Sequence, residues 1–281
     1  MNPPPSTKLF IEGRYLKHTR DLPQTIFFCP RCKGHARRRQ GCERCEGFGK
    51  LTKDSVQELI GWVLGKAAGT RKHKFHGAGR EDLDVRMLGE GRPFVFELES
   101  PRLTRIDLAE VEATINSRNE GRLEVRGLHW TQKSRVRFLK EGKFAKDYRA
   151  KAAVSELPSP DRVKALIGQR YVVAQKTPSR VAHRRADLVR ERWIEILDIE
   201  VPEEQGEDEP FLFVTMRTQA GTYVKEAISG EDGMTDPSVA QQLGVAEARC
   251  LELDVLAILD EVGEESSEVI AEPPSPFGAG L

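Results

Sequence analysis

The segment between residues 76 and 93 contains residue types that can do chemistry on a phosphate-bearing ligand. Three carboxylates, Glu81, Asp82 and Asp84, stand between Arg80 and Arg86, with glycines nearby on both sides. Arginine recognises phosphate through a planar fork of N–H donors, and a nearby cation favours the ionised form of a carboxylate. Such a carboxylate would serve as a nucleophile or a base on a nucleotide. The same spacing also fits a polar turn before a strand.

Two cysteine pairs form a second candidate site. Cys29 and Cys32, and again Cys42 and Cys45, are separated by two residues, the spacing of a zinc knuckle. We expect a structural zinc ion, because four thiolates leave no open coordination position. His35 could replace one ligand. Disulfides are the rival interpretation, but they are rare in cytosolic proteins.

The zero net charge conceals an uneven distribution. Residues 1–50 hold 11 lysines and arginines against 4 acidic residues, whereas residues 251–281 hold 8 acidic residues and no basic one. The loop 202–210 holds another 5 acidic residues, so the rest of the chain has 44 basic residues against 31 acidic ones. This excess favours a polyanionic partner. The alternative is that the charges are scattered over solvated faces.

The chain shows no sign of a membrane or secretory segment. No run of about eighteen apolar residues occurs, and the N-terminus lacks the apolar core of a signal peptide. We therefore expect a cytoplasmic protein with no membrane partner.

Hydrophobic periodicity predicts alternating strands and helices. A capping box at 55–58 begins a helix, and a glycine-rich, basic turn follows at 65–80. Further helices are predicted at 107–118, 160–167 and 236–247, and strands at 93–98, 123–128, 148–154, 171–175, 193–199, 211–218 and 251–258. This succession predicts an α+β fold in which helices flank a mostly antiparallel central sheet.

Four regions are predicted along the chain. Residues 1–27 form an N-terminal extension, and residues 28–48 form a small zinc-binding segment whose fold depends on the metal. Residues 49–262 form the catalytic domain. Residues 263–281, acidic and then rich in proline and glycine, form a disordered tail.

Several separated blocks carry a resemblance to a known family. They are residues 76–97 (HGAGREDLDVRMLGEGRPFVFE), 13–15 with 20–25 (GRY, RDLPQT), 176–187 (KTPSRVAHRRAD), 218–226 (TQAGTYVKE) and 251–255 (LELDV). In this order they resemble the archaeal and eukaryotic tRNA pseudouridine synthases that act on uridines 54 and 55 of the T arm. The resemblance spans about residues 13–256 and implies the pseudouridine synthase fold.

The resemblance also implies a role for individual residues. Asp82 stands at the position of the family's catalytic aspartate. Tyr148 resembles the aromatic residue that packs against the target base, and Val224 and Leu253 resemble the apolar walls of the uracil pocket. The other interpretation of Tyr148 is a tyrosine that fills the sheet core, and that of 218–226 is a core strand ending in a charge. The resemblance further suggests that Lys225 holds a phosphate or pairs with the catalytic carboxylate, and that Arg80 and Arg86 hold the aspartate and nearby phosphates. It also suggests RNA backbone contacts by His183, Arg184 and Arg185, although these three also fit a solvated face.

The implied reaction is the isomerisation of uridine to pseudouridine. It needs no organic cofactor, ATP or nicotinamide. Asp82 would act as a nucleophile at the base or the sugar, or as the base that removes a ribose proton, and the sequence leaves these routes open.

The chain departs from the family in two places. Family members usually carry an N-terminal THUMP domain, whereas about 70 residues precede the catalytic block here. Either the zinc segment with residues 37–39 takes over RNA docking, or a separate protein does, or the enzyme is less selective. After Lys225 the family's aromatic residue and His-Gly-Asp are also missing.

Two other function classes fit the sequence less well than the synthase. The first is a non-catalytic tRNA- or RNA-binding protein that retains the synthase fold; the intact 79–82 motif and Tyr148 count against it. The second is a zinc-dependent deaminase, which fails because no His-x-Glu precedes the paired cysteines.

Overall fold

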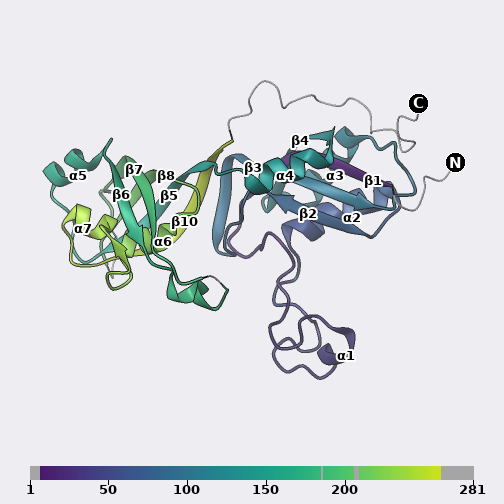
Figure 1. Cartoon of the computed structure of the whole chain (residues 1–281), viewed down its shortest axis with the longest axis horizontal. Helices are drawn as coiled ribbons and strands as arrows, with labels where there is room; N and C mark the ends of the chain where they lie inside the picture. Colours follow the sequence, from purple (N-terminus) through teal and green to yellow (C-terminus); the bar gives the residue numbers. More distant parts are fainter. Residues whose placement is uncertain (1–6, 185, 206–208, 261–281) are drawn as a thin grey trace. The chain divides into compact units, whose positions relative to one another are not determined.

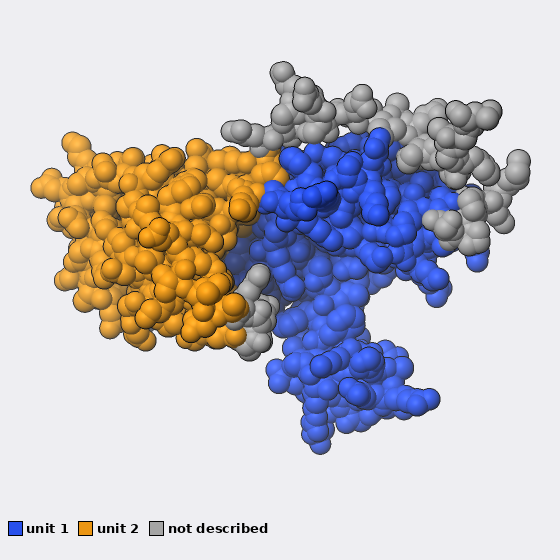
Figure 2. Space-filling model, viewed as in Figure 1, with its two compact units in different colours: residues 1–142, 262–281 blue, residues 143–261 orange. Residues whose placement is uncertain are grey.

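The computed structural model describes residues 7–184, 186–205 and 209–260 (Figure 1). The predicted tail at 263–281 lies outside the described residues. The chain divides into two compact units, unit 1 over residues 1–142 and unit 2 over residues 143–261 (Figure 2). Their boundary falls inside the region 49–262, which the sequence suggested as one domain.

Unit 1 is an antiparallel sheet with helices packed on it. Strand β1 lies between β4 and β3, and β2 pairs with the other side of β3. Helix α3 packs on β4, α2 packs on α3 and β2, and α4 packs on β2 and β3. The elements are β1 (Lys8–Lys17), α1 (Ala36–Arg39), α2 (Val56–Ala68), β2 (His73–Gly77), β3 (Val85–Glu99), α3 (Leu108–Arg118), β4 (Leu123–Thr131) and α4 (Lys133–Glu141).

Local sequence explains the helix α2. Its N-terminal cap is Ser55, whose side chain accepts a hydrogen bond from the Glu58 backbone N–H, and Gly69 ends the helix with φ +64°. The apolar stripe that begins at Val56 and Leu59 is buried, because these residues recur at helical spacing. The predicted helix is confirmed.

Unit 2 is a second set of antiparallel strands, in the order β10, β5, β8, β7, β6, β9. Helix α6 packs against β10 and against α7, which in turn contacts α5. The elements are β5 (Ala145–Val154), α5 (Pro160–Leu166), β6 (Arg170–Gln175), the 3₁₀ helix η1 (Ser179–Arg184), β7 (Arg190–Glu200), β8 (Phe211–Thr218), α6 (Val224–Ser229), β9 (Thr235–Asp236), α7 (Val239–Leu243) and β10 (Ala248–Leu259). The α+β class with mostly antiparallel strands is thereby confirmed.

Several boundaries differ from the sequence prediction. The turn expected at 65–80 was wrong, because α2 continues to Ala68 and His73–Gly77 forms strand β2. The helix expected at 236–247 is shorter, since Gly244, at φ +72°, ends α7 after Leu243. Strand β1 and helices α4 and α6 were not predicted. Within the described residues, no helix is both long and apolar enough to cross a membrane.

A clamped aspartate loop and a four-cysteine centre

Glu81 anchors the loop that carries Asp82. Its carboxylate lies 2.8 Å from Nε of Arg92, and both side chains are only 1% exposed. The Tyr15 hydroxyl donates to the same carboxylate, with distances of 2.8 and 2.9 Å to its two oxygens. Burial, and then the Glu81 charge, raise the pKa of Tyr15 well above its ordinary value. Tyr15 therefore stays a protonated donor, and Glu81 is held by one cation and one hydroxyl.

The backbone of the same loop is held by buried side chains. The ammonium group of Lys17 donates to the carbonyl oxygens of Leu22 at 2.9 Å, Asp82 at 3.2 Å and Leu83 at 2.9 Å. Arg92 donates to the carbonyl oxygen of Ala78 at 2.7 Å. Gln24, which also donates to the Tyr15 hydroxyl, donates to the carbonyl oxygen of Gly79 at 3.1 Å. The chain is thus fixed on both sides of Asp82.

These contacts give neighbouring acidic residues different environments. Glu81 is buried, Asp82 is half-buried and Asp84 is exposed. Arg80 is exposed on the same loop, and Arg86 is half-buried at the start of β3. A half-buried carboxylate on a fixed backbone is suited to act as a nucleophile or a base, because its position is set before a substrate arrives.

The predicted base pocket lies in unit 2. Tyr148 is half-buried on β5, and Leu253 is buried on β10. In the register of these strands Tyr148 faces Val255 and Ala150 faces Leu253, so the structure brings Tyr148 and Leu253 to one face as diagonal neighbours.

Helix α6 carries two more of the predicted site residues, Val224 and Lys225. The segment 218–226 is not a strand that ends in a charge. Strand β8 stops at Thr218, and buried Val224 opens the helix, followed by half-buried Lys225. The next residue, Glu226, is buried and forms an ion pair with Arg180 of η1. This pair ties α6 to the segment that contains His183 and Arg184. The side chains of those two residues and all of Arg185 lie outside the described part.

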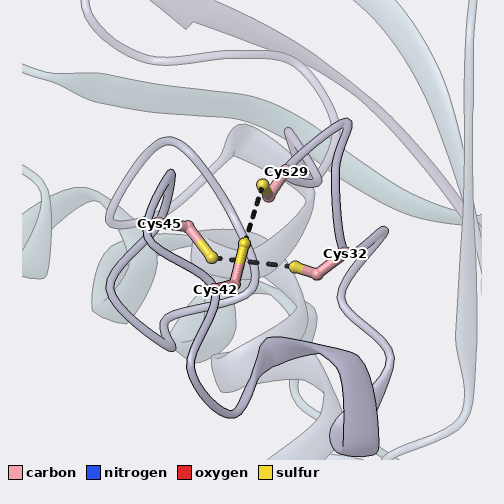
Figure 3. Close-up of side chains that lie close together, drawn as sticks. All are labelled: Cys29, Cys32, Cys42 and Cys45. Carbon is pink, nitrogen blue, oxygen red and sulfur yellow. Dashed lines mark hydrogen bonds between the residues drawn. The ribbon is translucent and has the colours of Figure 1, made fainter.

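The four cysteines converge on one point (Figure 3). Their sulfur atoms all lie within 4.8 Å of one another, and the side chains are 0–8% exposed. The distance from Cys29 to Cys42 is 3.9 Å, and that from Cys32 to Cys45 is 3.7 Å. Four sulfurs at about 2.3 Å from a tetrahedral metal would lie about 3.8 Å apart. The arrangement therefore fits a metal ion, and none of the described cysteines forms a disulfide.

Backbone N–H groups surround this centre. Gly49 donates to the Cys45 sulfur at 3.2 Å. The N–H of Cys32 is the main cause that lowers the pKa of Cys29 to about 7, whereas burial raises that of Cys32 to about 11. Backbone hydrogen bonds join the start of the segment to its end. The Cys29 N–H donates to the Gly49 carbonyl oxygen at 3.0 Å, and the Leu51 N–H donates to the Phe27 carbonyl oxygen at 2.8 Å. The segment is thus a loop closed by hydrogen bonds around a buried thiol cluster.

Comparison with known proteins gives the family. Residues 10–259 match the family model described as Pus10, C-terminal. The chain belongs to the Pus10 family. It is 42% identical over 262 residues to the tRNA pseudouridine synthase Pus10 of Methanopyrus kandleri, covering 92% of this chain and 58% of that protein. Against Pus10 of Archaeoglobus fulgidus it is 42% identical over 251 residues, covering 89% and 67%.

The chain thus spans only part of the length of these Pus10 relatives. Among solved structures, a Cbf5-Nop10-Gar1 complex matches 88% of this chain and 58% of the other chain, with 18% identity and a TM-score of 0.38. The family resemblance inferred from the sequence is confirmed, whereas the roles of the individual site residues stay predictions.

The residues that hold the loop carrying Asp82 were not predicted as site residues. Gln24 lies in the family-like block 20–25, Lys17 lies just after block 13–15, and Arg92 lies in block 76–97, and these blocks were the only signal for them. Their role follows from the carbonyl and carboxylate contacts described above.

We expect Glu81→Gln to destabilise unit 1 strongly. Removing one partner of a buried ion pair leaves the other charge uncompensated, which costs about 3–5 kcal/mol. Urea unfolding followed by circular dichroism measures the loss. The matched control is Glu141→Gln, whose partner Arg137 is exposed on α4 and whose loss should change stability little. Equal midpoints for the two variants would contradict the anchoring role of Glu81.

Lys17 should make stability depend on pH in a defined direction. Burial lowers its pKa to about 8 from an ordinary value of 10.5. Between these values the unfolded chain holds a proton that the folded chain has lost, so stability rises with pH. The difference in unfolding free energy between wild type and Lys17→Met should therefore rise between about pH 8 and 10.5, by up to about 1.4 kcal/mol per pH unit. A difference that stays flat over this range would show that Lys17 keeps its ordinary pKa in the folded protein.

Proposed function

We propose that this chain is the catalytic part of a tRNA pseudouridine synthase that isomerises uridine to pseudouridine in the T arm of tRNA, at position 54, 55 or both. The observation that carries the proposal is the Pus10 family match over residues 10–259, which includes the loop at 78–84. The curated relatives are named as tRNA pseudouridine synthases. Asp82, half-buried on a backbone held by Lys17 and Arg92, is the proposed catalytic aspartate.

The reaction rearranges bonds within one nucleotide. The glycosidic bond between C1′ and N1 breaks, the uracil rotates, and C1′ bonds to C5. C5 then loses its proton, and N1 gains one, so the product is an isomer and no net oxidant or reductant is required. The Asp82 carboxylate acts as a nucleophile toward the base or the sugar, or as the base that removes a ribose proton.

The target nucleotide must leave its stack to reach the enzyme's pocket. An unstacked base needs an aromatic or apolar surface to replace its lost neighbours. Tyr148 and Leu253, on one face of β5 and β10, would provide that surface. Val224 at the start of α6 adds an apolar side chain, and Lys225 adds a cation for phosphate.

RNA binding is the proposed role of the basic groups. Arg80 and Arg86 flank Asp82, and the proposal extends to His183, Arg184 and Arg185. The zinc segment adds Arg37 and Arg38, which are exposed and form no ion pair among the described residues. This segment, or a separate RNA-docking protein, would help to dock the tRNA. We place the enzyme in the cytoplasm.

The proposed metal is a structural zinc ion. A buried set of four thiol groups, with sulfur spacings near a tetrahedral edge, suits zinc. Cys29, Cys32, Cys42 and Cys45 would hold it, and the metal would order residues 28–48. Its four protein ligands would leave it no catalytic position.

Asp82→Asn should abolish pseudouridine formation while tRNA binding persists. Loss of a catalytic acid or base costs at least about 100-fold in rate. Site-resolved pseudouridine mapping on an unmodified tRNA transcript, without cofactor, measures this loss of pseudouridine formation. Asp84→Asn is the matched control, because Asp84 is exposed on the same loop, and its activity should stay within a few-fold of wild type. Full activity of Asp82→Asn would refute its catalytic role. A wild type that binds tRNA but forms no product would favour the non-catalytic RNA-binding protein.

The purified chain should contain about one equivalent of zinc. Elemental analysis should find it in wild type and in Cys250→Ser, since Cys250 lies outside the cluster, and should find little in Cys32→Ser. Because binding a structural metal is coupled to folding, a strong chelator should lower the unfolding temperature of wild type. Equal metal content in Cys32→Ser and Cys250→Ser would contradict the site.

A further inference from the structure

A basic pocket on unit 1 lies outside the loop and the cysteine centre described above. It has a volume of about 900 Å³ and is formed by α2, by the turn that leads into β2, and by the segment after β3. Its lining includes Lys66, Arg71, Lys72 and Arg102 and contains no acidic residue. None of these four cations has an ion-pair partner within the described part of the chain. Four uncompensated positive charges around one hollow favour a ligand with several negative charges.

An exposed tryptophan lies beside these cations. Trp62 is 54% exposed, although its neighbours Val63 and Leu64 on α2 are buried. It stands one helical turn before Lys66, so both side chains point to the same side of the helix. An aromatic ring next to unpaired cations is the combination that binds single-stranded nucleic acid, in which the ring stacks on a base and the cations contact phosphates.

Glycines bring the walls of the pocket together. A Cβ at Gly61 would lie 2.8 Å from His73 Cε1, and a Cβ at Gly65 would lie 2.7 Å from the carbonyl oxygen of Thr70. Only glycine allows these approaches, which place the 69–73 segment directly on α2. Gly61 and Gly65 therefore let the 69–73 segment pack against α2 beside Trp62 and Lys66.

Hydrogen bonds fix the rim. The Thr70 N–H donates to Gly65 O at 2.9 Å, and its hydroxyl donates to Glu99 O at 2.7 Å. The Arg102 N–H donates to Ala68 O at 2.8 Å. The backbone that carries the cations is thus set in advance, and binding a ligand would not have to order it.

We propose that this pocket binds a single-stranded stretch of the substrate RNA, with one base stacked on Trp62 and the adjoining phosphates held by Arg71, Lys72 and Arg102. The pocket is a second RNA contact, separate from the nucleotide that is isomerised. The identification of this RNA as the enzyme's substrate is the one part that rests on the proposed function. The binding itself is measurable without catalysis.

The test measures binding of a fluorescein-labelled octa-adenylate, which has no uridine for the catalytic site, to the full chain. Trp62→Leu should weaken binding roughly 5- to 150-fold, the range for loss of one stacked base. Trp62→Phe retains an aromatic face and should restore most of the affinity. Leucine and phenylalanine are both apolar, so a difference in affinity between the two variants reports stacking rather than burial. Equal binding by wild type, Trp62→Leu and Trp62→Phe would overturn the proposal.

The cations are tested by salt dependence. Arg71→Ala combined with Lys72→Ala should reduce the slope of log affinity against log salt by roughly 1.4, since each phosphate contact on a single strand contributes roughly 0.7. The control removes the same charge from α4 through Lys133→Ala and Lys140→Ala, both exposed and outside the pocket. An unchanged slope in the pocket variant, or an equal change in the control, would refute a specific phosphate site.

Two further comparisons separate this inference from its alternatives. Adenosine monophosphate should bind far more weakly than the octamer, and equal affinity would assign the pocket to a free nucleotide instead. On tRNA, the pocket variants should raise KM for pseudouridine formation and leave kcat at saturating tRNA near wild type. If wild type forms no pseudouridine but the pocket variants still lose RNA binding, the proposed function fails and the RNA site stands.

Discussion

The buried pair of Glu81 and Arg92 is the interaction on which the position of the candidate catalytic loop depends. Each charge would be costly to bury alone. Their opposite charges compensate one another, the Tyr15 hydroxyl donates to the same carboxylate, and Arg92 also donates to the carbonyl oxygen of Ala78. Arg92 belongs to β3 and Tyr15 to β1, so the loop is fixed to the two central strands of unit 1. Any change that shifts the register of those strands would also move Asp82.

The same geometry gives two adjacent acidic residues different environments. Glu81 forms an ion pair with Arg92 and accepts hydrogen bonds from Tyr15 inside the unit, and its burial leaves no access for a substrate. Asp82 follows on a backbone whose carbonyl group is held by Lys17, and its side chain is half-buried. Glu81 is thus the structural charge of the loop, and Asp82 is the acidic residue that stays accessible. This difference agrees with the choice of Asp82 as the proposed catalytic residue.

Much of the fold followed from local sequence signals, whereas the packing around the loop did not. The cysteine cluster was predictable because its ligands lie within seventeen residues and their spacing is set by the metal. Helix α2 was predictable from its cap and apolar stripe. Strand β2 was hidden, because its sequence HKFHG carries no clear alternation. Lys17 and Arg92 look like surface charges in the sequence, and only the pairing of β1 with β3 shows that they are buried.

The pairing of the cations also decides which positive charges of a chain with no net charge are open to a polyanion. In unit 1, Lys17 and Arg92 are buried among carbonyl and carboxylate oxygens, and Arg135 forms an ion pair with Glu12. These cations stabilise the fold and offer little to a ligand. The cations around the α2 pocket differ, since the described residues give them no acidic partner and leave them exposed. A charge count over the whole chain cancels them against distant acids, but screening removes most of that cancellation beyond about 10 Å. Local pairing rather than net charge therefore decides where a polyanion would bind.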